Sequence, residues 1–544
     1  MKMLSVKKIA LILFLSVSVL GVQLGCIDRP YFGHFSSYQI VSAFIARNML
    51  KERFTELLLP KTDLMIGKKQ SLPLNQYPLH SLMAASGVRY LGGSLEFWGR
   101  FQAVIFNVGS IILTGLIAGL LFGSGAGWIA AVLMSLSPYA LIYGQAFMSE
   151  SSVLFFLLLS LYLLLSALYR NLDVHPLRLL LASASFSVAL VGRIHFLTFL
   201  PVFWLIAYFS SQSFRHRLSF ILFFSVFALI PSLAWYTHTY FVSIHSDNIH
   251  SNLFLQLSGR SLADAHYLSD LNYYRHVFDI FVEKMLTPLA FPFFPIGLFL
   301  LKREKGGEKS TFILMAGFLL GISMVILFPQ KIMDHEFYLY GVFPFCIIIA
   351  AFGLSKIVEK VPELKQWPVV FFFLLLYLAV SARYFVHPIY KFPEEKKELI
   401  PMARAIQEKT HPEDWLVIAS RGFSELRYYV ERPSWDMSFP AIGTELPYYF
   451  KKSRFSKVNY QELARLEEAM RDPITWLEYL KNEGASYLVI PNERELDDVP
   501  GFRTYLNKYY TKLPLTDHSL FFKLTQPNQT SAQELQDVTT PGGG

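Results

Sequence analysis

The sequence predicts a polytopic α-helical membrane protein that carries a soluble α/β domain at its C-terminal end. Of the 544 residues, 53% are hydrophobic and 17% are charged, whereas a soluble protein has about a quarter charged residues. Long apolar runs alternate with short loops up to Phe385, and the chain is polar beyond it. We therefore expect a membrane domain over 1–385, a soluble domain over 386–525 and a disordered tail over 526–544.

About eleven apolar runs are long enough to cross a bilayer. We expect these crossings at 9–26, 101–122, 127–147, 151–169, 178–192, 196–210, 218–240, 286–302, 311–328, 338–355 and 367–383. The first run is either a retained helix or a cleaved signal peptide, and we favour the retained helix because the long loop after it needs an anchor. The two long loops, 27–100 and 241–285, fall on one side of the membrane.

The charge of the short loops predicts the orientation. If the N-terminus is cytoplasmic, the loops on the inside carry Lys2, Lys7, Lys8, Arg170, Arg178, Arg215, Arg217, Lys302, Arg303, Lys305, Lys309, Lys356, Lys360 and Lys365. Such an excess of basic residues marks the cytoplasmic side, so both long loops and the C-terminal domain are expected to be periplasmic or extracellular. Topology and anionic lipids account for the net charge of +8, and we predict no nucleic-acid partner.

Periodicity predicts the elements of the external parts. In the first long loop, two amphipathic helices are expected at 38–59 and 78–91, with Arg47 on the polar face of the first. Amphipathic helices beside a membrane tend to lie in its interface. In the C-terminal domain we expect strands at 415–420, 487–491 and 518–524, and helices at 397–409 and 474–483.

Cations and aromatic hydroxyls gather in two external turns, and they suit a phosphate attached to a sugar. Arg193 and His195 lie between two crossings, and the segment 331–340 combines a lysine, a histidine, acids and tyrosines. Arginine beside a membrane-embedded phosphate is a natural partner, although a snorkelling arginine and an ordinary aromatic belt are alternatives. The candidate phosphate-binding residues are Arg193, His195, Lys331, His335, Tyr338 and Tyr340.

The acids on the same side supply candidates for catalysis. Asp28 closely follows the first crossing, and Asp28 or His34 is a candidate general base towards an acceptor. Glu150 and Glu336 are candidates for contacts with the acceptor or a metal, and for Glu150 the alternative is a stabilising charge at a helix N-terminus. A divalent cation, Mg²⁺ or Mn²⁺, is a candidate cofactor, whereas Cys26 and Cys346 are too few to form a metal cage.

Several segments together resemble the membrane glycosyltransferases of the GT-C fold, in particular bacterial relatives of dolichyl-phosphate-mannose–protein mannosyltransferases and of the lipid A aminoarabinose transferase. The segments that carry the resemblance are 36–50, 76–82, 99–101, 137–150, 191–195, 335–344, 421–432 and 484–490. The resemblance implies a polyprenyl-phosphate sugar as donor, a lipid, glycan or protein acceptor, and transfer on the outer face of the bacterial inner membrane. It also implies that Glu150 is the acid after the third crossing, that Arg193 faces the phosphate, and that His335 and Tyr338 lie near it.

The sequence departs from this family at the catalytic base. Such enzymes often carry an Asp-Glu pair in the first loop, whereas residues 32–38 here contain no acid. Either Asp28 or His34 fills the role, or the chain has lost catalysis and is a scaffold of the same fold. A transporter or flippase for lipid-linked sugars is the other alternative, which the near absence of charges in the middle of the crossings disfavours.

Overall fold

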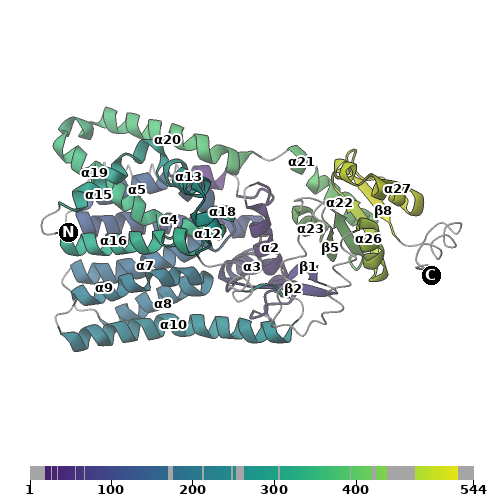
Figure 1. Cartoon of the computed structure of the whole chain (residues 1–544), viewed down its shortest axis with the longest axis horizontal. Coiled ribbons are helices and arrows are strands. Elements are labelled where there is room, and N and C mark those ends of the chain that lie inside the picture. Colours follow the sequence, from purple (N-terminus) through teal and green to yellow (C-terminus); the bar gives the residue numbers. More distant parts are fainter. Residues whose placement is uncertain are drawn as a thin grey trace. The chain divides into compact units, whose positions relative to one another are not determined.

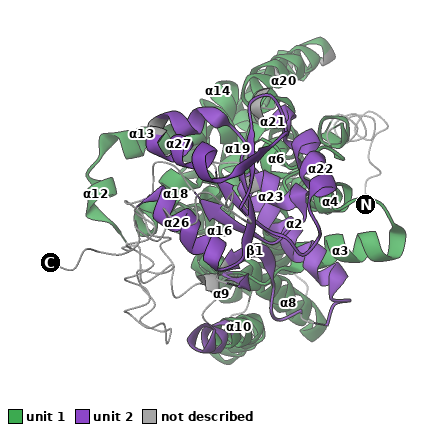
Figure 2. Cartoon of the chain, turned by 90° about the vertical axis from the view of Figure 1, so that its right-hand side faces the viewer, with its two compact units in different colours: residues 1–35, 76–238, 257–391 green, residues 36–75, 239–256, 392–544 purple. Residues whose placement is uncertain are grey.

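The computed structural model describes residues 19–25, 27–33, 35–55, 57–66, 68–169, 175–210, 213–246, 249–252, 263–303, 307–391, 394–419, 424–437 and 472–524. His34, Cys26 and the predicted tail from 526 onwards lie outside these residues. The chain forms two compact units (Figure 2). Unit 1 comprises residues 1–35, 76–238 and 257–391, and unit 2 comprises residues 36–75, 239–256 and 392–544.

Unit 1 is built from apolar helices (Figure 1). Among the described residues, the helices long and apolar enough to cross a membrane are Leu95–Phe122 (α4), Glu150–Tyr169 (α7), Phe214–His245 (α10), Glu308–Leu327 (α16 and α17) and Pro368–His387 (within α20). Leu271–Met285 and Thr287–Leu301 add a sixth span if this pair, bent by 91°, counts as one. The chain is thus a multi-pass helical membrane protein, and the number of eleven crossings stays a prediction.

The other elements of unit 1 are shorter. They are α3 (Leu79–Leu91), α5 (Ser124–Ser135), α6 (Pro138–Tyr143), α8 (Pro176–Gly192), η1 (Ile194–Phe199), α9 (Leu200–Ser210), α12 (Ala265–Leu268), α13 (Leu271–Asp279), η2 (Ile280–Met285), α14 (Thr287–Ala290), α15 (Phe293–Leu301), α18 (Pro329–Asp334), η3 (Glu336–Leu339), α19 (Phe343–Lys360) and η4 (Pro362–Lys365). The full bounds of the split or longer helices are Glu308–Ile322 for α16, Met324–Leu327 for α17 and Trp367–Tyr390 for α20.

Small residues let α4 and α5 approach closely. A Cβ atom on Gly127 of α5 would lie 2.7 Å from the carbonyl oxygen of Gly115 and 3.0 Å from the Cα of Gly119, both in α4. Gly115 and Gly119 are four residues apart and therefore share one face of the helix. This is the small-residue packing that membrane helices use in place of large apolar side chains.

The predicted crossing at 127–147 is not one helix. α5 ends at Ser135, and a new short helix, α6, begins at Pro138. Ser137 caps α6 by accepting a hydrogen bond from the amide of Tyr139, and proline at the first helical position lacks the N–H that a continuing helix would need. The stretch after α6 runs without helix to Glu150, so this apolar segment turns back to form part of a polar site.

Two other predicted boundaries are also wrong. The crossing expected at 286–302 is split into α14 and α15, and Thr287 at the break has φ of 62°. The crossing expected to begin at 338 begins at Phe343, because residues 336–339 form the 3-10 turn η3. The expected loop at 241–285 contains α12, α13 and the π-helical turn η2. In both crossings the apolar pattern is correct and the backbone is broken by local turns.

Unit 2 holds an eight-stranded mixed sheet with the order β3-β2-β1-β5-β4-β6-β8-β7. Its strands are β1 (Thr62–Ile66), β2 (Lys69–Leu74), β3 (Ile249–Asn252), β4 (Trp415–Ala419), β5 (Ser434–Met437), β6 (Ala485–Ile490), β7 (Thr511–Leu513) and β8 (Leu520–Lys523). Parallel pairing joins β1 with β5, β5 with β4, and β4 with β6, whereas β8 is antiparallel to both β6 and β7.

Helices complete unit 2. They are α2 (Ser36–Lys51), α21 (Glu394–Lys397), α22 (Leu399–Lys409), α23 (Ser424–Val430), α26 (Pro473–Asn482), η5 (Glu493–Asp498) and α27 (Pro500–Tyr509). Three predicted strands and two predicted helices of the C-terminal part are confirmed as β4, β6, β8, α22 and α26. The helices expected at 38–59 and 78–91 are confirmed as α2 and α3, although α2 ends at Lys51. The strands β1, β2, β3, β5 and β7 were not predicted from the sequence.

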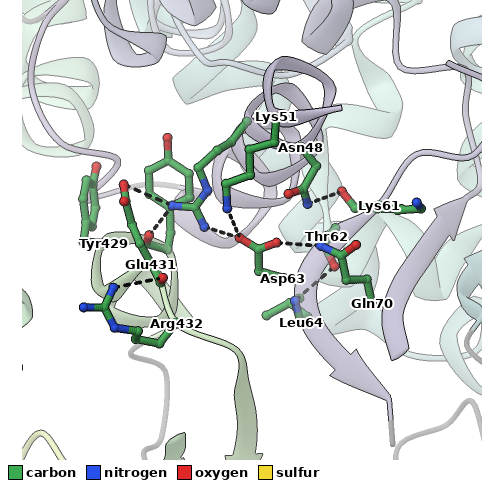
Figure 3. Close-up of polar contacts among 12 residues, drawn as sticks. Asn48, Lys51, Lys61, Thr62, Asp63, Leu64, Gln70, Tyr429, Glu431 and Arg432 are labelled. Atoms are coloured by element: carbon green, nitrogen blue, oxygen red, sulfur yellow. Dashed lines mark hydrogen bonds and ion pairs between the residues drawn. The ribbon is translucent and has the colours of Figure 1, made fainter. Parts of the chain in front are cut away.

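The prediction that Arg47 lies on the exposed face of its helix is wrong, because Arg47 is 8% exposed. Figure 3 shows its partner Asp63 together with Gln70 and Lys51. Its guanidinium donates to Asp63 Oδ2 at 2.5 Å and to the carbonyl oxygen of Tyr428 at 2.7 Å. The same group stacks on the ring of Tyr428, at 4.5 Å from the centroid, and Gln70 donates to the other oxygen of Asp63 at 2.9 Å. Arg47 thereby joins α2, β1 and the end of α23.

Burial tends to raise the pKa of Asp63, but the charges of Arg47 and Lys51 and the hydrogen bonds from Asn48 and Arg47 outweigh it. The pKa of this carboxyl therefore lies below its ordinary value. Such a pair is stable in the interior of unit 2 because both carboxylate oxygens of Asp63 accept hydrogen bonds, from Arg47 and Gln70.

Candidate functional site

The polar residues of unit 1 meet where its helices are broken. We define the polar cluster as Tyr139, Tyr143, Glu150, Arg193, His195, Lys284, Lys331, His335, Glu336, Phe337, Tyr338 and Tyr340. These residues come from α6, the start of α7, the α8–η1 junction, η2, α18, η3 and the turn before α19. Ser137 fixes two of these elements together, since its hydroxyl donates to the carbonyl oxygen of Met285 at 2.9 Å.

A first ion pair joins Glu150 and Arg193. Arg193 Nη2 donates to Glu150 Oε1, and the two side chains are 10% and 3% exposed. Glu150 is the first residue of α7, where the helix dipole favours a negative charge, and Arg193 follows the end of α8. The guanidinium also lies over the ring of Phe337, at 5.2 Å from the centroid. The second carboxylate oxygen, Glu150 Oε2, is buried and has no hydrogen-bond partner within the described residues.

A second ion pair joins Lys284 and Glu336. Lys284 Nζ donates to Glu336 Oε2, and the Tyr143 hydroxyl donates to Glu336 Oε1 at 2.9 Å. The Tyr139 hydroxyl donates to the backbone oxygen of Glu336 at 2.6 Å. Both carboxylate oxygens of Glu336 are therefore engaged. Lys284 is the more open partner, with 31% of its side chain exposed against 6% for Glu336.

Aromatic rings connect the two ion pairs. Tyr143 contacts Tyr340, with centroids 5.4 Å apart, and Tyr139 contacts the same ring at 5.3 Å. On the other side, the imidazole of His195 packs against Tyr338 at 5.0 Å, and Lys331 Nζ lies 5.9 Å from the centre of that ring. Aromatic surface of this kind supports sugar rings and apolar chains, and tyrosine adds a hydrogen-bonding hydroxyl.

His335 completes this side of the cluster. Its imidazole stacks on Phe337 with an interplanar angle of 3° and centroids 5.3 Å apart. Phe35 reaches the same ring and that of Tyr143, each at 5.5 Å, from a backbone with φ of 56°. Phe35 is therefore held in a left-handed conformation that a bulky residue adopts only where the surroundings fix it.

The structure brings together all eight predicted phosphate, acceptor and metal residues: Glu150, Arg193, His195, Lys331, His335, Glu336, Tyr338 and Tyr340. It does not bring Asp28 to them. Asp28 is exposed, and among the described residues no hydrogen bond or ion pair joins its carboxylate to the polar cluster. Its neighbours Ile27 and Pro30 are instead fixed by Arg100, which donates to their carbonyl oxygens at 3.0 and 3.1 Å. His34, the other candidate base, lies outside the described residues.

The segment before α3 borders the first ion pair. The amide of Tyr77 donates to the carbonyl oxygen of Val191 at 3.1 Å, and the Ser149 hydroxyl donates to Gln76 Oε1 at 2.9 Å. His80, at the start of α3, is buried against Phe147. Burial, and then the charge of Arg193, lowers the pKa of His80 to about 3, so its imidazole is neutral at pH 7.

Three members of the cluster were missed in the sequence. Tyr139 and Tyr143 lie inside a run that reads as a single crossing, although Ser137-Pro138 is a helix-start signal within it. Lys284 lies at the end of a long polar loop, directly before an apolar run. Its position in a π-helical turn is the kind of irregularity that often marks functional sites, but no local pattern in the sequence predicts it.

The described residues contain no group of three or more histidine, cysteine or acidic residues that would hold a metal ion. In the polar cluster, Glu336 has both oxygens engaged and Glu150 has one. The residues present therefore do not form a ready metal-binding set, and we derive no chemical step through a metal.

No protein-family model and no curated protein sequence matches the chain. Solved structures do match. ArnT from Cupriavidus metallidurans bound to undecaprenyl phosphate is similar over 95% of this chain and 99% of its own length, with a TM-score of 0.64 and 14% identity. The archaeal oligosaccharyltransferase AglB from Archaeoglobus fulgidus, in complex with an inhibitory peptide and a dolichol-phosphate, has a TM-score of 0.55 at 12% identity and covers 93% of this chain and 72% of its own.

The chain has the GT-C fold. A further structure of the Archaeoglobus fulgidus oligosaccharyltransferase, in complex with Zn and sulfate, agrees with a TM-score of 0.53, 13% identity, and coverage of 95% of this chain and 73% of its own. The fold expected from the sequence segments is thereby confirmed. Identity this low leaves the reaction and the substrates to be argued from the site.

Proposed function

We propose that the protein is a glycosyltransferase that moves a sugar from a polyprenyl-phosphate donor to a lipid, glycan or protein acceptor on the outer face of the bacterial inner membrane. The observation that carries the proposal is the polar cluster itself. It gathers the cations Arg193, Lys284 and Lys331 beside tyrosine hydroxyls in a helical membrane unit. Structures of the same fold hold undecaprenyl phosphate or a dolichol-phosphate, which agrees with a lipid-linked donor.

The charges in the cluster suit a phosphodiester that becomes a phosphomonoester. Three cations face two carboxylates, so the ionised cluster keeps one positive charge when both histidines are neutral. That charge attracts a glycosyl phosphodiester. As the bond between the sugar and the phosphate breaks, negative charge grows on the leaving oxygen, and Arg193, Lys331 and His335 are placed to stabilise it. His195, Tyr338 and Tyr340 orient the phosphate and the sugar, and Glu336 holds Lys284 in place.

The resemblance assigns the general base to Asp28 or His34. Asp28→Asn tests the first assignment, because it removes the base and keeps the shape of the side chain. Loss of transfer with normal expression would support Asp28, whereas normal transfer would exclude it.

The decisive experiment is transfer of radiolabelled sugar from a panel of synthetic polyprenyl-phosphate sugars by the purified full-length protein. A crude extract of envelope lipids and glycans supplies the acceptor. Label that appears in an acceptor fraction establishes the transferase and identifies both substrates. Chelation, followed by addition of Mg²⁺ or Mn²⁺, tests the divalent cation as a cofactor in the same assay.

A lipid-linked-sugar flippase is the second candidate, because one observation favours it. The pair Leu271–Met285 and Thr287–Leu301 is bent by 91° beside Lys284, and broken helices are typical of transporter binding sites. Movement of a fluorescent polyprenyl-phosphate sugar across proteoliposomes, without transfer to any acceptor, would support this reading. Donor binding with neither movement nor transfer would support a catalytically inactive scaffold.

A further inference from the structure

Glu150 presents a buried carboxylate oxygen that the protein does not use. Its side chain is 3% exposed, and Arg193 occupies Oε1 alone. Oε2 has no hydrogen-bond partner among the described residues. A buried acceptor left without a donor costs about 1–3 kcal/mol, so such an atom in a functional cluster calls for an explanation. A ligand with an N–H or O–H group would satisfy it.

The other acids near the site do not share this property. Both carboxylate oxygens of Glu336 accept hydrogen bonds, from Tyr143 and Lys284. Asp28 is exposed and is not joined to the cluster within the described residues. Glu150 is thus the acid that combines burial, an open oxygen and direct contact with a candidate phosphate-binding residue.

The surroundings of Glu150 are those of a reacting group. It lies near enough to Tyr139, Tyr143 and Tyr340 to interact electrostatically with their hydroxyls. His195 Nε2, in the same cluster, is a second buried polar atom that has no hydrogen-bond partner in the described part of the chain. Two unsatisfied buried atoms in one polar cluster indicate that a polar ligand belongs there.

We propose that Glu150 is the general base of the transfer reaction, in place of the missing acid pair of the first loop. This inference rests on the proposed function. Glu150 Oε2 accepts the proton of the acceptor hydroxyl or amine while the acceptor atom forms a bond to the anomeric carbon. The bond from that carbon to the phosphate oxygen breaks, and its electron pair leaves with the polyprenyl phosphate. Carboxylates perform this proton transfer in glycosyl chemistry, where the transition state resembles an oxocarbenium ion.

Arg193 is the positioning residue for this base. It holds Oε1 and leaves Oε2 open, and in the proposed function it also contacts the phosphate. One guanidinium therefore fixes the distance between the base and the leaving group, which is what an in-line displacement requires.

The test uses the full-length protein and two measurements on each variant. The first is transfer from the donor that the unmodified protein uses, with envelope extract as acceptor. The second is binding of undecaprenyl phosphate, the shared lipid part of the panel, as a non-reacting probe. We expect Glu150→Gln to lower transfer by about 100-fold or more while the affinity for undecaprenyl phosphate stays the same or rises, because Arg193 loses its counter-charge.

Matched variants separate the base from its neighbours. Glu359→Gln, which removes an exposed acid outside the polar cluster, should keep transfer near the unmodified level, and Glu336→Gln should weaken probe binding as well as transfer. In Glu150→Ala, added formate should restore part of the transfer, since a small carboxylate entering the vacated space takes the proton. A purely structural role would not respond to formate.

Three results would overturn the inference while the proposed function stands: transfer that survives in Glu150→Gln, abolition of transfer by Asp28→Asn, or a parallel loss of transfer and probe binding in Glu150→Gln. If the unmodified protein transfers sugar from none of the donors, the proposed function fails, and the inference fails with it.

Discussion

Each unit contains a buried pair of an arginine and a carboxylate, and the two pairs differ in how completely they are satisfied. In unit 2, Arg47 and Gln70 between them engage both oxygens of Asp63. In unit 1, Arg193 engages one oxygen of Glu150 and leaves the other without a partner in the described residues. Both pairs are buried and both join an arginine to a carboxylate, so neither burial nor charge distinguishes a pair that stabilises the fold from one that serves a functional site.

The difference lies in the remaining hydrogen-bonding capacity. The Asp63 carboxylate is saturated and has no oxygen to offer a ligand, and its pair serves the fold because Arg47 joins α2, β1 and α23. The open oxygen of Glu150 is a costly atom in the interior, and its position in the polar cluster calls for a functional explanation. The predictions below test this contrast by removing one partner at a time.

The largest effect is expected from Arg193→Ala. It removes the cation that holds Glu150 and contacts the proposed phosphate, so transfer should fall by about 1,000-fold, the upper range for the loss of one stabilising group in a transition state. Binding of undecaprenyl phosphate should weaken in the same variant. Arg303→Ala is the matched control, since Arg303 is exposed and only stacks on Phe299. Equal activity of the two variants would contradict the role of Arg193.

Arg47→Met should affect stability rather than chemistry. It leaves the buried Asp63 without its main partner, which costs about 3 kcal/mol or more. Thermal unfolding and limited proteolysis of the full-length protein should report this loss, while transfer per folded molecule stays unchanged. Lys68→Met is the control, because Lys68 and Glu483 are largely exposed, and breaking their pair should cost less than about 1 kcal/mol. A stable Arg47→Met protein would show that the network is dispensable.

Lys284→Met should have a smaller effect than either of these variants. It removes a cation from the site and takes the lysine away from Glu336 Oε2, while the Tyr143 hydroxyl stays on Oε1. We expect binding of undecaprenyl phosphate to weaken by about 10-fold, which corresponds to about 1.4 kcal/mol. The double variant Lys284→Met/Glu336→Gln no longer carries the buried Glu336 charge, so its thermal stability should return towards that of the unmodified protein. Its binding of undecaprenyl phosphate should stay weak, because the cation is still missing. Lys356→Met, which breaks the pair with the exposed Glu359 outside the polar cluster, serves as the control.

The smallest expected effect is the loss of the stability that Asp63 contributes when the pH is lowered. Because the pKa of Asp63 is lower in the folded protein, its contribution to stability is fully present above the unfolded pKa, which is about 3.9. That contribution is lost as the pH falls through the folded value. The stability gap between the unmodified protein and Asp63→Asn should therefore stay constant from pH 7 to about pH 4 and narrow below it. Unfolding curves in this range measure the gap, and a gap that closes near pH 6 would contradict the assignment.

The sequence predicts long apolar helices well, because twenty apolar residues have few other stable arrangements. It predicts the C-terminal strands β4, β6 and β8 for a similar reason, since each is a buried apolar run. The short strands β1 and β2 escape prediction, because pairing with residues far along the chain stabilises them. Arg47 was placed on the wrong face for the same reason: its partner Tyr428 is 381 residues away.

At the site, it was easier to predict from the sequence which residues take part than to predict which residues lie next to one another. The turns around Arg193 and 331–340 are rich enough in charge to be noticed, and they do meet in the structure. Lys284, Tyr139 and Tyr143 reach the polar cluster only because helices break beside them. Asp28 has no hydrogen bond or ion pair with the cluster among the described residues, although its position just after the first crossing suggested a place there. Such breaks depend on tertiary packing, which local patterns do not contain.

The sheet of unit 2 also sets the order in which the chain can be completed. Strands β1 and β2 leave the ribosome more than 300 residues before β5, the strand that pairs with β1. Through the synthesis of most membrane helices, the early hairpin therefore has an open edge, and Arg47 has Asp63 beside it but lacks the carbonyl oxygen of Tyr428. The open edge of β1 is covered only when β5 arrives, so a truncation before β5 would leave this early strand exposed to aggregation, far from the deleted residues.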